Sequence, residues 1–216
     1  MLRDFMRQNR RILCFLLFIP VILIFFLAEA RNCERIPIHC AADDWIPFLP
    51  VFIIPYVLWY LYIPFLLGVI CFTDPLAFRR QCVSFFGGAG ICLLIILVFP
   101  TRIDFRPEIP GGGTNLFEWM CSVIFRLDDP VNVFPSMHCF EAVCVHLTAF
   151  SVPQLRKKTG WRIASATLSV LICLSTVFIK QHSVLDLIAG VLLAVLLSLP
   201  VMLRNRRIIQ NDRTSV

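Results

Sequence analysis

The sequence predicts an all-α integral membrane protein, a bundle of six transmembrane helices in a single domain over residues 1–216. Three observations support this fold class. Hydrophobic residues make up 58% of the chain and charged residues only 16%, whereas a soluble domain is about 25% charged. Long apolar runs recur along the chain, and Lys and Arg gather in alternate connections between them. This composition excludes an ordinary soluble enzyme, and also a disordered chain, which would be poor in apolar residues.

Six apolar runs supply the predicted spans, since one crossing takes about 17–25 helical residues. The first, third and fifth runs are near the lower limit. The fourth has the weakest apolar character because it contains Glu141 and His146. Ala28-Glu29-Ala30, after the first run, would also fit a signal-peptide cleavage site, and cleavage there would remove that span. The runs are Ile12–Ala28, Leu49–Phe72, Val83–Phe99, Pro135–Val152, Ile163–Ile179 and Val184–Leu203.

The basic residues predict the orientation of the bundle. Of the 20 Lys and Arg residues, 14 fall on one side of the predicted spans, and positive loops stay in the cytoplasm. Both termini are therefore expected to be cytoplasmic, with loops 29–48, 100–134 and 180–183 facing outward. The net charge of +6 is spread over alternating loops rather than over one contiguous face, so no nucleic-acid partner is expected.

Two features of the outward loops leave alternatives open. Cys33 and Cys40 share a loop, and they form either a disulfide, if that side is oxidising, or two free thiols. The segment 115–127 carries several large apolar residues. It is either an interfacial helix that admits a lipid or a loop helix packed on the bundle.

Ionisable residues beside apolar runs are costly, so each suggests a function. Arg102, Arg106, His138, His182 and Asp186 all lie near outward ends of the predicted spans. Cationic side chains and one carboxylate converging at one interface are the groups needed to bind an anion such as phosphate.

His182 and Asp186 are four residues apart, which places them on one face of the helix that starts the sixth span. The carboxylate can accept the Nδ1–H of the imidazole, which leaves Nε2 free as a nucleophile. The alternative is a buried pair that only fixes helix packing.

Pro135-Ser136-Met137-His138 opens the fourth run. Proline and an N-cap serine are ordinary helix-start signals. The free N–H groups of a helix N-terminus also suit a phosphate, Ser136 could add its hydroxyl, and His138 could deliver a proton to a leaving oxygen.

Together these residues resemble the type 2 phosphatidic acid phosphatase superfamily, which includes glucose-6-phosphatase and vanadium haloperoxidases. The family pattern has three parts: Lys, six residues, then Arg-Pro; Pro-Ser-Gly-His; and Ser-Arg, five residues, His, three residues, Asp. This chain matches with Arg106-Pro107, then 135–138 with Met137 in place of Gly, then Ser175-Thr176, five residues, His182, three residues, Asp186. The resemblance covers residues 100–186 of the chain.

The resemblance implies a role for each matching residue. His182 would attack phosphorus, Asp186 would orient His182, and His138 would protonate the leaving alkoxide and then activate water. Arg106, Ser136 and the helix start at Met137 would hold the phosphoryl oxygens. No metal or other cofactor is implied, because side chains and amides neutralise the developing charge.

The chain departs from the family pattern at two cations, since Phe99 stands at the lysine position and Thr176 at an arginine position. Arg102 and Lys180 are candidate replacements. The arrangement Pro100-Thr101, four residues, Arg106 also resembles the branch of inositol phosphotransferases and sphingolipid synthases, which pass the phosphoryl group to an alcohol.

The expected function is metal-independent dephosphorylation of a lipid phosphate, such as phosphatidate, phosphatidylglycerophosphate or a polyprenyl pyrophosphate, on the extracytoplasmic face. The expected location is a bacterial inner membrane. A phosphotransferase with a lipid alcohol acceptor, or a non-enzymatic membrane protein that kept the fold, is the alternative. The sequence predicts no oligomeric state.

Overall fold

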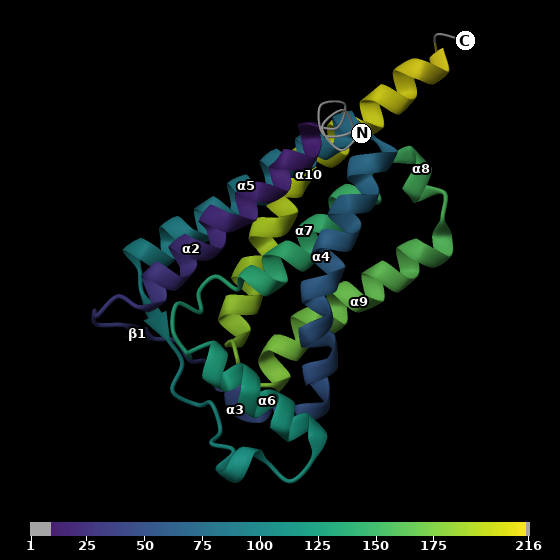
Figure 1. The fold of residues 1–216 in the computed structure, drawn as a ribbon. Helices are drawn as coiled ribbons and strands as arrows, with labels where there is room; N and C mark the ends of the chain where they lie inside the picture. Colours follow the sequence, from purple (N-terminus) through teal and green to yellow (C-terminus); the bar gives the residue numbers. More distant parts are fainter. Residues whose placement is uncertain (1–9, 215–216) are drawn as a thin grey trace, which may run out of the picture.

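Figure 1 shows the chain as a computed structural model, a bundle of long helices with a cluster of loops and short helices at one end. The structure describes residues 10–214, and it describes side chains for residues 11–205. Within that range the strands are limited to β1 (Ile36–Pro37) and β2 (Thr101–Arg102). The regular secondary structure of the described residues is therefore almost entirely helical, as expected for a membrane protein of this composition.

The helices follow the order of the apolar runs. The first run forms the 3-10 helix η1 (Arg10–Leu17) and α2 (Phe18–Glu29), and the other long helices are α4 (Ile53–Thr73), α5 (Pro75–Val98), α9 (Thr159–Phe178) and α10 (Val184–Thr214). Shorter segments connect or fill the bundle. These are α3 (Ala41–Trp45), η2 (Pro50–Phe52), η3 (Pro110–Gly112), α6 (Leu116–Leu127), α7 (Met137–Ala149) and α8 (Pro153–Arg156).

Five stretches of the described chain are long and apolar enough to cross a membrane, with mean hydropathies between 1.6 and 2.9. Much of their surface is apolar and exposed, which is what lipid-facing helices require; Leu27 on α2, for example, is 71% exposed. The chain is therefore an integral membrane protein. The five stretches are Arg11–Glu29, Pro50–Thr73, Pro75–Val98, Thr159–Phe178 and Val184–Asn205.

The prediction of six spans is not confirmed, because the fourth run forms a helix of only 13 residues, α7. At 1.5 Å per residue this helix is about 20 Å long, against a hydrocarbon core of about 30 Å. Helix α7 packs against α4, α5, α9 and α10, and most of its side chains are buried. Its polar residues Glu141 and His146 are thus placed among protein rather than in lipid.

The third helix begins earlier than its apolar run, at Pro75 instead of Val83. Asp74 caps it by accepting hydrogen bonds from the backbone N–H groups of Leu76 and Ala77 at 3.1 and 2.9 Å. Proline at the first helical position is compatible with this start. The polar residues 79–81 therefore belong to the first turns of α5, and Asp74 alone connects α5 to α4.

Glycine allows α10 to approach α7 closely. A Cβ on Gly190 would collide with the backbone carbonyl oxygen of Ser136 and crowd Cys139. Small residues let helix backbones approach in this way inside membranes. The contact holds the start of α10, which follows His182, against the start of α7, which carries His138.

The connections fall into two groups at opposite ends of the bundle. At one end β1 pairs in parallel with β2, with Ile36 opposite Thr101, and the side chain of Asp43 accepts a hydrogen bond from Ser183 at 2.6 Å. The three loops predicted to share one side therefore contact each other near β1, α3 and α6 (Figure 1). At the other end Arg80 and Ser151 both hydrogen-bond Asn205.

Candidate active site

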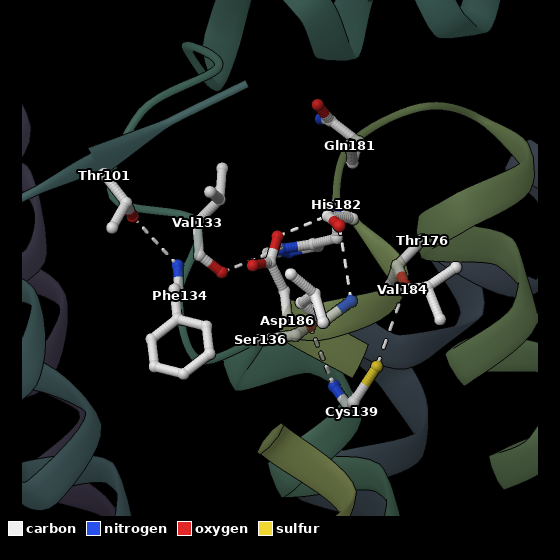
Figure 2. Close-up of polar contacts among 12 residues, drawn as sticks. Thr101, Val133, Phe134, Ser136, Cys139, Thr176, Gln181, His182, Val184 and Asp186 are labelled. Carbon is white, nitrogen blue, oxygen red and sulfur yellow. Dashed lines mark hydrogen bonds and ion pairs between the residues drawn. The ribbon is translucent and has the colours of Figure 1, made fainter. Parts of the chain in front are cut away.

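His182 lies in the turn between α9 and α10, with its imidazole held by two acceptors. Its Nδ1 is 2.9 Å from the backbone carbonyl oxygen of Val133 and 3.4 Å from the Oδ2 of Asp186. Figure 2 shows the ring between these two groups. Because a carbonyl and a carboxylate can only accept, Nδ1 carries the proton, and Nε2 keeps a free lone pair.

Asp186 is fully buried in the first turn of α10. Its Oδ2 accepts a hydrogen bond from the backbone N–H of Ser183 at 2.8 Å, which fixes the carboxylate beside His182. Its Oδ1 is buried without a hydrogen-bond partner among the described residues. The structure thus brings together the pair that the i to i+4 spacing predicts.

The start of α7 is joined to the start of α10 through its backbone. The N–H of Ser136 donates to the carbonyl oxygen of Asp186 at 3.1 Å. The Ser136 hydroxyl accepts from the backbone N–H of Cys139 at 3.4 Å and so caps α7. Ser136 is fully buried and its side chain acts as an N-cap here, which is the structural role its position predicts.

His138 lies one residue into α7 and faces His182, with ring centroids 5.6 Å apart. It stacks on Tyr56 at 4.7 Å and lies 4.4 Å from the ring of Trp59. Aromatic packing therefore orients this ring, and its nitrogens make no hydrogen bond within the part of the chain that the structure describes. Both nitrogens remain available to a bound molecule.

The two histidines border a small cavity of about 40 Å³. Arg106 and Met137 also line it, which brings four of the predicted site residues to one place. The other lining residues come from α2, from the loop before α7 and from the turn before α10. They are Phe25, Asp128, Asp129, Val131, Asn132, Val133 and Gln181.

Arg106 reaches the cavity from the long loop after α5. Its Nη1 donates to the backbone carbonyl oxygen of Asp128 at 2.7 Å, and its Nη2 donates to the side-chain carbonyl of Gln181. The guanidinium lies 4.7 Å from the ring centroid of Phe125. Its Nε is buried without a partner among the described residues. Arg106 is thus a fixed positive charge at the cavity wall.

The two candidate replacement cations lie outside the cavity. Arg102 pairs with Asp104 at 2.6 Å on the surface, where its side chain is 47% exposed. The Nζ of Lys180 donates to the backbone carbonyl of Asp43 at 2.7 Å and lies 5.5 Å from the ring centroid of Phe105. Neither residue lines the cavity that the histidines border.

The structure shows where the two residues that replace family cations, Phe99 and Thr176, lie. Phe99, at the lysine position, is 56% exposed at the end of α5. Thr176, at the arginine position, is buried. Its carbonyl oxygen accepts hydrogen bonds from the backbone N–H groups of Gln181 and His182 at 2.9 and 3.0 Å. Thr176 therefore shapes the turn that carries His182 instead of presenting a cation.

Asp43 is a site-supporting residue that sequence reasoning missed. Its carboxylate accepts from the Ser183 hydroxyl at 2.6 Å and from the backbone N–H of Val184 at 2.8 Å. It therefore caps the N-terminus of α10 from the short helix α3, about 140 residues away in the sequence. Burial opposes ionisation of Asp43, but these hydrogen bonds outweigh burial and lower the pKa of its carboxyl.

Burial and charge act in opposite directions on the pKa values of His182, Asp128 and Arg106. Burial alone lowers the pKa of the His182 imidazole, but the neighbouring carboxylate of Asp186 outweighs it, so that pKa is raised above its ordinary value. Burial raises the pKa of Asp128, and His182 and Arg106 offset part of that rise. Burial lowers the pKa of Arg106, partly offset by Asp128. An arginine nevertheless stays charged at neutral pH.

Asp128 and Gln181 were also missed by sequence reasoning. The Oδ2 of Asp128 accepts from the Tyr56 hydroxyl and from the Nε2 of Gln181, both at 3.1 Å. Only their positions in the sequence point to a role at the site. Asp128 lies in the loop before the Pro-Ser-Met-His motif, and Gln181 directly precedes His182. All ten cysteines are free in the structure, including Cys33 and Cys40.

Comparison with known proteins identifies one family. A model of the PAP2 superfamily matches residues 121–199, the region that holds both histidines and Asp186 but not Arg106. No curated protein and no solved structure matched the chain. Among the described residues, no cluster of three or more His, Cys, Asp or Glu side chains is arranged to hold a metal ion.

Proposed function

The chain belongs to the PAP2 superfamily through residues 121–199, and from this premise we propose that it dephosphorylates a membrane lipid phosphate through a phosphohistidine. Membership itself indicates phosphatase-type chemistry on a phosphate ester. The lipid substrate, the covalent intermediate and the sidedness are the parts that we propose here.

One observation carries the proposal: the Nδ1 of His182 is held between two acceptors beside a cavity that His138 also lines. This arrangement fixes the tautomer that keeps Nε2 unprotonated, as a nitrogen nucleophile requires. The second imidazole has no competing hydrogen bond in the described chain. A nucleophile oriented by a carboxylate, facing a proton donor across a cavity, is the arrangement of covalent catalysis.

The reaction proceeds in two steps. In the first, the Nε2 of His182 forms a bond to phosphorus while the bond from phosphorus to the lipid oxygen breaks, and His138 gives its proton to that oxygen. In the second, water attacks phosphorus, His138 takes a proton from the water, and the N–P bond breaks. Inorganic phosphate leaves, and both histidines return to their starting protonation states.

Charge on the phosphoryl oxygens is neutralised mainly by Arg106, which is fixed at the cavity wall. The backbone N–H groups of the first α7 turn, at Met137 and His138, lack intrahelical partners and add further donors. Ser136 contributes through the helix start that it caps. Arg102 and Lys180 would have to leave their present partners to contribute, so we assign them no direct contact in this conformation.

A membrane lipid is the favoured substrate because the reactive groups lie at one end of a bundle of apolar helices. Phosphatidate, phosphatidylglycerophosphate and polyprenyl pyrophosphate are the classes to test. The distribution of basic residues supports an active site on the extracytoplasmic face, and the location that we propose is a bacterial inner membrane.

A second candidate is phosphoryl transfer to an alcohol. The cavity is lined by the carboxylates of Asp128 and Asp129 and by the amides of Asn132 and Gln181. Carboxylates repel a doubly charged phosphate monoester, whereas they accept hydrogen bonds from the hydroxyls of an alcohol acceptor or a polar head group. This lining is the observation that keeps transfer to an alcohol as the second candidate.

The test is phosphate release by the purified chain in detergent, with a chelator present, over the three lipid classes. His182→Ala should abolish release, since it removes the nucleophile. His39→Ala is the matched control, because His39 is exposed and pairs with Asp44 on the surface. We expect release that survives the chelator and is retained in the control.

Other outcomes separate the candidates. If no phosphate appears but a labelled phosphoryl group moves to an added lipid alcohol, the chain is a phosphotransferase. If neither product forms, the enzyme proposal fails and a non-enzymatic membrane protein remains.

A further inference from the structure

Asn132 lies in the wall of the cavity with both polar atoms of its side chain unused. It is 4% exposed and lines the same cavity as the two histidines. Its Nδ2 and Oδ1 are buried without a hydrogen-bond partner among the described residues. Buried amides in native proteins nearly always find partners, so an unpartnered amide bordering a cavity indicates that a bound group completes it.

The backbone holds Asn132 firmly in this position. Its N–H donates to the carbonyl oxygen of Thr101 at 2.6 Å, and the Thr101 hydroxyl accepts from the N–H of Phe134 at 3.1 Å. Figure 2 shows this second contact beside the Val133 carbonyl, which accepts from His182. The segment that orients the imidazole therefore also fixes Asn132.

The backbone of Asn132 has a φ of 56°, in the left-handed region. Asparagine adopts this conformation more readily than most residues. This conformation belongs to a residue that also lines the cavity.

We propose that Asn132 binds the substrate directly, with its Nδ2 donating a hydrogen bond to a phosphoryl oxygen while His182 attacks. This inference rests on the proposed function of the site. It gives the cavity a neutral donor where the family pattern would supply two further cations. The cavity already holds two carboxylates, so a donor that can contact phosphate without forming an ion pair with them suits this site.

The test uses Asn132→Gly, because glycine accepts a positive φ without strain, and Asn132→Asp, which keeps the shape but loses the donor. We expect kcat/KM for lipid phosphate to fall about 100-fold or more in both, the effect of losing one donor to a developing charge. Binding of orthovanadate, a mimic of the pentacoordinate phosphoryl group, should weaken by about tenfold or more. It is measured as the shift of the thermal unfolding midpoint.

A structural role for Asn132 would give a different result. Because the amide makes no protein hydrogen bond, ligand-free Asn132→Gly should unfold at the same temperature as the wild type or above it. Asn205→Ala is the matched control. It removes a buried amide bonded to Arg80 and Ser151 at the far end of the bundle, so it should lower the unfolding midpoint and change kcat/KM less than about twofold.

The outcomes distinguish this inference from the function on which it rests. An active wild type with near-normal kcat/KM and vanadate binding in Asn132→Gly overturns the role of Asn132 alone. A variant that loses activity only because its ligand-free form unfolds at a lower temperature also overturns it. A wild type that neither turns over nor binds orthovanadate overturns the proposed function and this inference with it.

Discussion

At the scale of single residues, the site depends on how His182 is held. Two acceptors face its Nδ1, and one of them is the charged group Asp186. A carboxylate at this position fixes the tautomer, and in the proposed reaction it would stabilise the positive charge that develops on the imidazole. It also raises the pKa of His182, despite the burial that would lower it.

This pKa shift predicts the acid side of the pH profile. Below its pKa His182 is protonated at Nε2 and cannot attack phosphorus, so activity falls as the pH drops. The pKa of His182 is raised above its ordinary value. As the pH is lowered, kcat/KM should therefore reach half of its plateau value at a pH that is still above about 6.5. A profile that is flat between about pH 5 and 9 would contradict the assigned role.

The variant Asp186→Asn tests the same effect of the carboxylate on the pKa of His182. Without the carboxylate, kcat should fall by about a factor of 10⁴, and the residual activity should persist to lower pH because the group that raises the pKa of His182 is gone. Asp44→Asn, at an exposed carboxylate paired with His39, is the control and should keep the wild-type profile.

At the scale of elements, the site is assembled by the contact between the starts of α7 and α10. Ser136 donates a backbone hydrogen bond to Asp186, and Gly190 lets the two helices approach. Asp43 then caps α10 from the loop that carries α3. The histidines are therefore aligned by helix packing and by one buried carboxylate, not by a direct bond between them.

Gly190→Ala tests this packing. The new Cβ would collide with the Ser136 carbonyl, and overpacking of this kind costs about 1–3 kcal/mol. Displacing the start of α7 by about 1 Å should lower kcat about 100-fold. Thermal unfolding in detergent and lipid phosphate hydrolysis measure the two effects.

Gly68→Ala is the control for this helix contact. Gly68 lies inside α4, where an added Cβ meets nothing within 4 Å. This variant should keep its activity and should be as stable as the wild type or more stable, by up to about 1 kcal/mol. Equal behaviour of the two variants would contradict the close contact between α7 and α10.

At the scale of the whole molecule, the sequence predicts a helical membrane protein and the proximity of His182 to Asp186, and the structure has both. Spacing alone places Asp186 beside His182, and the structure has them together. The alternation of basic loops predicts two sets of connections, and the structure groups them at two ends. These features follow from local periodicity and from charge, which a single sequence displays directly.

The rest depends on tertiary packing that a sequence does not display. Hydropathy cannot distinguish burial in protein from burial in lipid, so the short helix α7 reads as a span. The backbone carbonyl of Val133 accepts the hydrogen bond from His182. Because every residue has a backbone carbonyl, the residue type at position 133 does not indicate this contact. Lys180 has a φ of 57° and binds the Asp43 carbonyl, so its nearness to His182 in the sequence does not place its charge in the cavity.

The most direct test of His182 as the nucleophile is to locate the phosphoryl group on the chain. Purified protein is mixed with a lipid phosphate labelled with ³²P, quenched in alkali after a fraction of a turnover, and digested into peptides. A phosphohistidine survives alkali and is lost in acid. We expect alkali-stable, acid-labile label on the peptide that contains His182, and none in His182→Ala. Turnover without labelled protein, or label on another residue, would contradict His182 as the nucleophile.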